Sequence, residues 1–154
     1  MLDDMEGELL KLKQEIETIK RVSPISTYKD LEVYQLSYRA MLITIKFVIC
    51  NLPNFEKFDL VDQLRRSSKA VPRLISEGYA KKHQPRGFGR YLDDAAAEIN
   101  ETEVGLQQCI DLYSENIDIE LVRWLVDIYS RLGKQVFSLK NSWVYVYKSS
   151  SPTS

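Results

Sequence analysis

The stretch FGRYLDDAAAEINETEVGLQQCIDLY, residues 88–113, decides the fold class of this chain. Apolar and small side chains recur in it at alternating intervals of four and three residues: Phe88, Leu92, Ala95, Ile99, Thr102, Leu106, Cys109 and Tyr113. These intervals place them on one face of an α-helix and leave the charged side chains on the other face. The pattern predicts a long amphipathic helix with one buried face.

Helical spacing also predicts helices over residues 29–52 and 121–143. Another helix is predicted between the turn at 51–54 and the stretch quoted above. The connections between these segments are short, which favours antiparallel neighbours. Six Gly and five Pro leave little room for the many tight turns of a β-sandwich. The sequence therefore predicts an all-α chain, built as an antiparallel up-down-up-down four-helix bundle.

The N-terminal residues carry a narrower apolar stripe in front of these four helices. Its members follow an unbroken three-four spacing: Leu2, Met5, Leu9, Leu12, Ile16 and Ile19. This is the seam of a coiled coil, and an isolated helix of that length is marginal in water. We therefore expect an additional N-terminal heptad helix that packs on its own chain, on copies of itself or on a partner protein.

The expected domain organisation has four parts. Residues 1–22 form the coiled-coil-like helix, residues 23–27 a polar hinge, residues 28–147 the four-helix bundle, and residues 148–154 a disordered Ser-rich tail. The hinge begins at Ser23-Pro24, because proline disfavours the helical conformation of the residue before it.

A net charge of −1 hides a strong separation of charge along the chain. Between positions 65 and 90 there are eight basic residues and one acid, Glu77; the basic ones are Arg65, Arg66, Lys69, Arg73, Lys81, Lys82, Arg86 and Arg90. Residues 93–120 then contain nine acids and no base. The basic run either follows nucleic-acid phosphates, meets the acidic run of a neighbouring copy, or is a solvated face. Tyr79, Phe88 and Tyr91 lie near it at helical spacing, which favours packing over stacking on bases.

Patterns typical of catalysis are missing from the sequence. The one histidine, His83, has Ala80 three residues before it, so the Glu-x-x-His pairs of di-iron bundles are absent. Cys50 and Cys109 fall on apolar helix faces, which favours core positions. We expect no enzymatic activity, no catalytic residue, no metal and no cofactor. The acidic start and the lack of a 20-residue apolar run favour a cytoplasmic protein without a membrane partner.

Short motifs in the basic run resemble a known signature. Gln63-Leu-Arg-Arg66, Ala70-Val-Pro72 and Ile75-Ser-Glu-Gly78 resemble the "QLRRA…SVP.NIAEG" pattern of the bacterial four-helix bundle proteins encoded in 23S rRNA intervening sequences. The chain departs from that pattern at Leu74, where the family has Asn, and at Ala97-Glu98, where it has a small Gly-Ser pair.

Further motifs follow in the order that this family has. Tyr28-Lys-Asp-Leu-Glu-Val-Tyr34 resembles its opening "F.DL.VY", Phe88-Gly-Arg-Tyr-Leu92 its "F.RYL", and Glu101-Thr-Glu103 the two acids of its "ELE". The resemblance covers about residues 28–143, so the N-terminal heptad helix is not part of it.

The resemblance implies an antiparallel four-helix bundle that assembles as a ring, typically a homopentamer, with a role in nucleic-acid biology. The accessory protein of diversity-generating retroelements is similar in fold, and there the bundle partners a reverse transcriptase. We therefore expect a homo-oligomer that binds RNA, in preference to DNA, through the eight basic residues named above. The alternative is a protein-interaction adaptor, such as an accessory subunit of a reverse transcriptase or another nucleic-acid enzyme.

Overall fold

The computed structural model describes the backbone of residues 1–150 and the side chains of residues 1–143. Within that range the chain is helical and has no strand, so the all-α prediction is confirmed. The α-helices are α1 (Leu2–Glu17), α2 (Glu32–Ile43), α3 (Leu60–Ala80), α4 (Gly87–Tyr113) and α5 (Ile119–Ser150). The tail predicted at 148–154 begins within the last turn of α5 and continues into residues 151–154, which lie outside the described residues.

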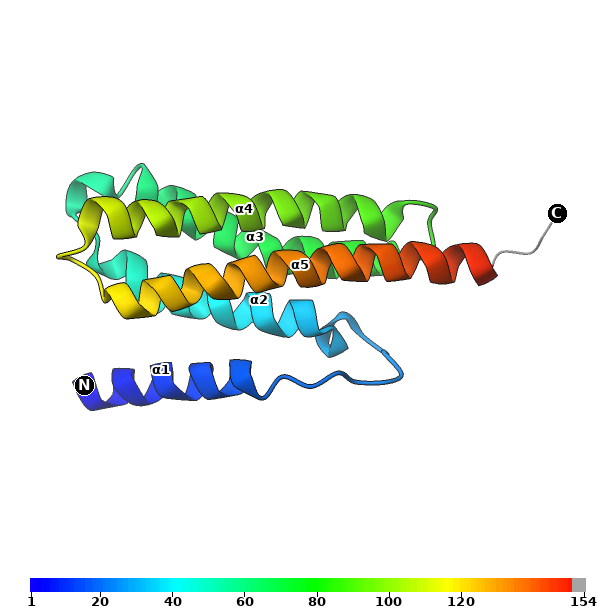
Figure 1. Ribbon diagram of the computed structural model, residues 1–154, viewed down its shortest axis with the longest axis horizontal. Helices are drawn as coiled ribbons and strands as arrows, with labels where there is room; N and C mark the ends of the chain where they lie inside the picture. Colours follow the sequence, from blue (N-terminus) through cyan, green and yellow to red (C-terminus); the bar gives the residue numbers. More distant parts are fainter. Residues whose placement is uncertain (151–154) are drawn as a thin grey trace.

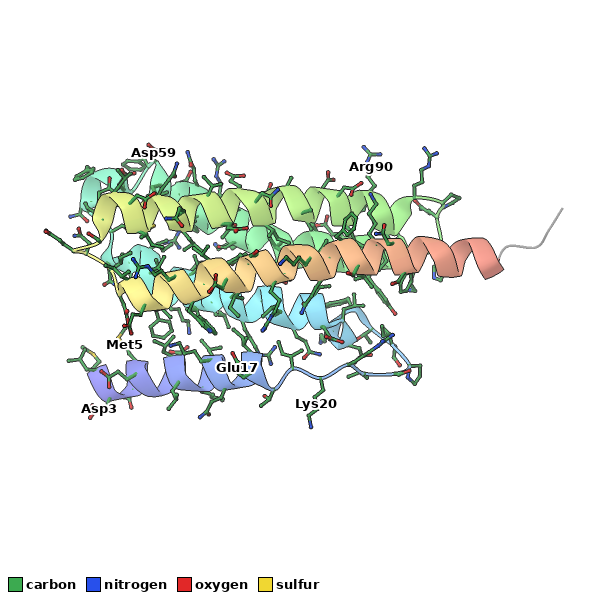
Figure 2. The ribbon with its side chains drawn as sticks, in the orientation of Figure 1. Asp3, Met5, Glu17, Lys20, Asp59 and Arg90 are labelled. Carbon is green, nitrogen blue, oxygen red and sulfur yellow. The ribbon has the colours of Figure 1, made fainter. Side chains whose placement is uncertain are left out.

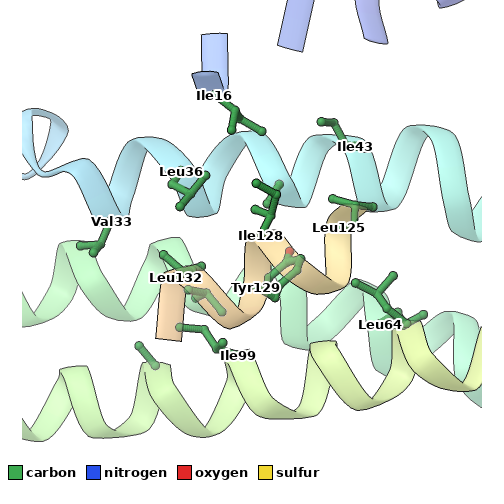
Figure 3. Packing of buried hydrophobic residues seen from close by; sticks show 14 of the residues in the cluster. Ile16, Val33, Leu36, Ile43, Leu64, Ile99, Leu125, Ile128, Tyr129 and Leu132 are labelled. Carbon is green, nitrogen blue, oxygen red and sulfur yellow. The ribbon is translucent and has the colours of Figure 1, made fainter. Parts of the chain in front are cut away.

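The helices α2 to α5 lie side by side, and successive helices run in opposite directions (Figure 1). Helix α3 packs against α4, α4 packs against α5, and α2 contacts both α3 and α5. Their apolar faces meet in one core, where Leu36 of α2, Ile99 of α4 and Leu132 of α5 are fully buried (Figure 3). Helix α1 lies along the outside of α2.

The second helix is less regular than its apolar spacing predicts. After α2 ends, a π-helical turn, η2 (Thr44–Val48), and a 3₁₀ turn, η3 (Ile49–Asn51), continue the rod. The wider π turn brings the fifth residue along the chain back to nearly the same face. Ile43 and Val48, at either end of this turn, are both buried in the core.

Length and composition alone would let the segment Glu32–Asn51 cross a membrane. The core helix of a soluble protein meets the same criterion. Here Val33, Leu36 and Ala40 of this segment are buried inside the protein. The apolar character of the rod thus follows from its contacts with α3 and α5 on one side and with α1 on the other.

Two of the six residues in the N-terminal heptad seam are buried against the chain's own helices, and two more, Leu9 and Ile19, are partly buried. Leu12 and Ile16 are 7% and 2% exposed, and Ile16 points from α1 toward α2 (Figure 3). Leu2 and Met5, at the other end of the seam, are 77% and 44% exposed. Of the three expected packing partners, the structure shows α1 on its own chain.

Two ion pairs join α1 to the rod that contains α2. The Nε atom of Arg39 lies 2.8 Å from a carboxylate oxygen of Glu15, and the Nζ atom of Lys46 lies 2.5 Å from one of Glu8. All four side chains are partly solvated, so each pair stabilises the contact by about 1 kcal/mol or less. The buried aliphatic side chains therefore dominate the attachment of α1.

The hinge predicted at 23–27 ends in a defined turn. Thr27 and Asp30 form a capping box around the 3₁₀ turn η1 (Tyr28–Asp30). The backbone N–H groups of Ser26 and Thr27 donate to the Asp30 carboxylate at 2.8 and 3.0 Å, and these bonds lower the pKa of Asp30. The ionised Asp30 carboxylate therefore stabilises the folded turn. This contribution is complete above the ordinary pKa of aspartate and is lost as the pH falls through the lowered pKa of Asp30.

The two cysteines differ in accessibility. Cys109 is buried, and burial raises the pKa of its thiol to about 12. Cys50 is exposed, so its expected position in the core is wrong. It lies in the 3₁₀ turn η3, which rotates it away from the apolar face, and its Sγ donates to the Lys46 carbonyl oxygen at 3.1 Å.

Deletion of residues 1–22 is expected to leave a cooperatively folded helical protein, because α2 to α5 keep their own apolar faces. The loss of two buried side chains should cost at most roughly 3–6 kcal/mol of unfolding free energy. Circular dichroism melting of the full and the truncated chain, with light scattering for assembly, measures both effects. A truncated chain that is molten at 25 °C would contradict the division at residues 23–27.

Thiol titration of the native protein should detect one cysteine. At pH 8 a thiol-specific reagent should modify the exposed Cys50 rapidly. Cys109 should react only after unfolding, because its thiol is buried and protonated. Cys50→Ser should remove the native reaction, and Cys109→Ser should leave it unchanged. Rapid modification of two thiols in the folded chain would contradict the packing around Cys109.

Candidate nucleic-acid interface

Three of the predicted basic residues form a straight line on α3. Arg65, Lys69 and Arg73 are one helical turn apart, and all three side chains are exposed; we call them the α3 stripe. Among the described residues, none of the three has a carboxylate within ion-pair distance, although Glu77 lies one turn after Arg73. The stripe therefore presents uncompensated positive charge to the solvent.

The adjacent Arg66 differs from the stripe. Its Nε atom lies 3.3 Å from a carboxylate oxygen of Asp62, one turn earlier on α3. It also faces Glu98 on α4, whose pKa is raised by partial burial and by the neighbouring Glu101 and is held down in part by Arg66. Arg66 is thus engaged by the acidic residues of its own chain.

The other four predicted residues lie at the end of α3 and the start of α4. Lys81, Lys82, Arg86 and Arg90 line a concave surface of about 1200 Å³, which we call the basic hollow. Arg90 projects from the start of α4 toward the solvent (Figure 2). The eight residues predicted as one site are therefore divided into a stripe, a paired arginine and a hollow.

The connection between α3 and α4 is tight enough to fix the rim of the hollow. Arg86 adopts a left-handed backbone conformation with φ of 63°, which is uncommon for a residue with a side chain. Gly87 follows because a Cβ atom there would lie 2.2 Å from the Lys81 carbonyl oxygen. These two residues turn the chain back within one short connection.

Gly78 sets the distance between α3 and α4 beside the hollow. A Cβ atom at this position would lie 2.6 Å from the Cβ atom of Tyr91 and 3.1 Å from the ring of Phe88. Real Cβ atoms do not approach so closely, so only glycine permits this contact. The geometry explains the Glu77-Gly78 pair as an element of packing.

Aromatic side chains form the inner wall of the hollow. Tyr79 and Phe88 are buried and pack edge to face on each other, with ring centroids 6.1 Å apart. Both also contact Trp143 of α5, at 6.3 and 4.9 Å. Trp143 and Tyr91 are half-buried and line the hollow. Sequence spacing gave no sign that Trp143 belongs here, because it lies on another helix, far along the chain.

The start of α3 lies at the end of the bundle opposite the hollow (Figure 1), and we call this the acidic end. There the hydroxyl of Tyr113 donates to the Glu56 carboxylate, which raises the pKa of Tyr113 to about 12. The second oxygen of Glu56 accepts from the backbone N–H of Leu60 at 3.0 Å, in the first turn of α3. Within the described residues, no cluster of three or more His, Cys, Asp or Glu side chains is placed to hold a metal ion.

Gly78→Ala is expected to lower the free energy of unfolding by roughly 1–3 kcal/mol, because the new methyl group forces α3 and α4 apart. Gly133→Ala on α5 is the matched control: its Cβ atom would lie 3.7 Å from Ile99, an ordinary contact. That variant should be neutral or gain up to ~1 kcal/mol of helix propensity. Chemical denaturation measures both, and equal stability of the two variants would contradict the close approach.

Comparison with known proteins identifies the family of this chain. The family described as 23S rRNA-intervening sequence protein matches residues 29–137, from the start of the first 3₁₀ turn to the middle of α5. A search of curated proteins finds no match. The matched region contains the α3 stripe and most of the basic hollow, whereas α1 and Trp143 lie outside it. The chain belongs to the family of 23S rRNA-intervening sequence proteins.

Proposed function

We propose that this protein is a non-enzymatic, cytoplasmic RNA-binding protein, and that it binds a structured RNA in preference to DNA. The α3 stripe is the primary contact with the phosphate backbone, and the basic hollow extends it. One observation carries the proposal: seven of the eight basic side chains between residues 65 and 90 are without an ion-pair partner in the described part of the chain.

Energetic arguments favour phosphate binding over a purely solvated surface. Each uncompensated cation adds to the repulsion among its neighbours, and a bound polyanion relieves that repulsion. A nucleic-acid backbone supplies regularly spaced phosphates, and neutralising them releases bound counterions. The stripe residues recur once per helical turn, which suits a row of phosphates better than a single small anion.

In this proposal the scaffold is the antiparallel four-helix bundle of α2 to α5, with α1 added on its outside. The protein is a homo-oligomer, and the family resemblance supports a ring, typically a pentamer. A ring repeats the α3 stripe on every subunit, so contacts that are weak alone act together. Membership of the 23S rRNA-intervening sequence family supports the nucleic-acid role.

A second candidate function is a protein-interaction adaptor, such as an accessory subunit of a reverse transcriptase. Exposed apolar side chains at the acidic end favour it: Phe55 and Phe58 are 76% and 88% exposed, and Leu112 is 64% exposed. Side chains of this kind are enriched in protein interfaces. A reverse transcriptase gene beside the gene for this chain would favour the adaptor, and a position within an rRNA insertion would favour RNA binding.

RNA affinity should fall steeply with salt, and replacing Arg65, Lys69 and Arg73 together by Gln should weaken it. On a duplex, the triple variant should flatten the slope of log affinity against log salt by up to about 2.7, which is about 0.9 for each lost phosphate contact. Fluorescence anisotropy with a labelled RNA hairpin over a salt series gives the slope.

The matched control replaces Arg123, Arg131 and Lys134 on α5 by Gln, which removes the same charge from another exposed surface. Its slope should stay close to that of the wild type. If the α3 variant binds with unchanged affinity and slope, the stripe is not the RNA site. If it dissociates the oligomer instead, the basic run is a subunit interface, as charge matching with the acidic run would allow.

A further inference from the structure

The basic hollow differs in chemistry from the α3 stripe. It combines five basic and two acidic side chains with two half-buried aromatic ones, and it includes Lys140 and Trp143 from α5. Its volume of about 1200 Å³ exceeds the roughly 300–1,000 Å³ of typical small-molecule sites. A surface of this size suits a segment of a polymer better than a single metabolite.

The aromatic wall of the hollow is packed against the core on its inner side. Trp143 is held on its core side by Phe88, with ring centroids 4.9 Å apart and an angle of 79° between the planes. Tyr91 is held at its Cβ atom by the backbone of Gly78. Side chains fixed in this way lose little conformational entropy when a ligand packs against them.

Basic side chains outnumber acidic ones around these rings, where the acids are Asp93 and Asp94. The Nζ atom of Lys81 lies 5.6 Å from the centroid of the Tyr91 ring, and that of Lys82 lies 4.1 Å from the centroid of the Tyr79 ring. Lys140 is engaged by Asp93 at 2.6 and 2.7 Å, which leaves Arg86 and Arg90 as the uncompensated cations of the opposite rim. Aromatic faces beside cations recognise a planar ring that is joined to a phosphate.

We infer that the basic hollow binds an unpaired nucleotide of a single-stranded or looped RNA segment. The base packs against Tyr91 and Trp143, and the phosphates on either side of it contact Lys81, Arg86 and Arg90. This inference rests on the proposed RNA-binding function and specifies the kind of RNA. A duplex would gain little from the hollow, because its bases are stacked on each other and only its backbone is accessible.

Binding measurements with two RNA probes test the inference. The probes are a hairpin with an unpaired loop and a blunt duplex with the same number of phosphates. Tyr91→Leu and Trp143→Leu should each weaken hairpin binding by about 5- to 150-fold, which corresponds to one lost stacking contact. Duplex binding, through the α3 stripe, should stay within about twofold of the wild type if the hollow contributes only stacking.

Conservative variants separate stacking from folding. Tyr91→Phe keeps the ring and should retain hairpin affinity, whereas Tyr91→Leu should not. Phe137→Leu is the matched control, because Phe137 is an aromatic residue of α5 that is 66% exposed and does not line the hollow. Circular dichroism melting shows whether each variant is folded at the temperature of the assay.

Tryptophan fluorescence provides a direct readout of the hollow. The chain has two tryptophans, so Trp124→Phe leaves Trp143 as the reporter. The hairpin should quench its emission, and the duplex should not. A single-stranded DNA with the loop sequence shows whether the ribose 2′-hydroxyl contributes.

The outcomes distinguish this inference from the proposed function. Weaker hairpin binding by Tyr91→Leu, with duplex binding intact, supports the inference. If Tyr91→Leu weakens both probes equally or neither, the hollow takes no unpaired base, and the proposed function stands. If the wild-type protein binds neither probe, both the proposed function and this inference are wrong.

Discussion

Close approach of α3 and α4 sets the positions of the other elements. Gly78 meets Tyr91 at one end of the pair, and at the other end a Cβ atom on Gly105 would lie 2.6 Å from a methyl carbon of Leu64. Between them, the buried hydroxyls of Thr102 and Ser67 lie 2.8 Å apart in a hydrogen bond across the two helices. Such contacts tolerate neither a wider spacing nor a shift along the axis, so the register of the two helices is fixed.

This register determines where the charges lie. The α3 stripe faces the solvent because the opposite side of α3 carries the small and apolar residues that meet α4. The acidic side chains of α4 approach α3 beside Arg66, where burial, and after it the neighbouring Glu101, raises the pKa of Glu98. Basic and acidic residues that are separate in the sequence are therefore neighbours in the fold, yet the stripe itself is left uncompensated.

Much of this architecture can be read from the sequence, because it depends on helical spacing. The period of residues 88–113 predicts α4 to within one residue at its start, and the Gly87 turn and the hinge before Tyr28 coincide with Gly and Pro signals. The π turn at Thr44–Val48 could not be predicted, since apolar spacing does not distinguish a π turn from a continued α-helix. For the same reason the exposure of Cys50 was missed.

Sequence spacing places the basic residues in one run but cannot divide that run into the parts that the fold separates. Whether Arg66 binds Asp62 or the solvent, and whether Arg90 joins a stripe or a hollow, depends on the neighbouring helix. The contribution of Trp143 depends on the distance between α3, α4 and the far end of α5, which no local pattern encodes.

The attachment of α1 has a consequence for how strongly that helix is held. Its interface includes two buried and two partly buried aliphatic side chains, a contact of Lys13 with the Trp124 ring and two solvated ion pairs, which is small for a contact between separate molecules. Residues 18–27 connect α1 to the rest of the chain. A short linker holds a helix near its contact surface, here on α2, at an effective concentration on the millimolar scale. A free peptide with the sequence of α1, at micromolar concentration, would leave this surface of α2 largely unoccupied. The buried side chains and the covalent connection therefore act together to keep this helix in place.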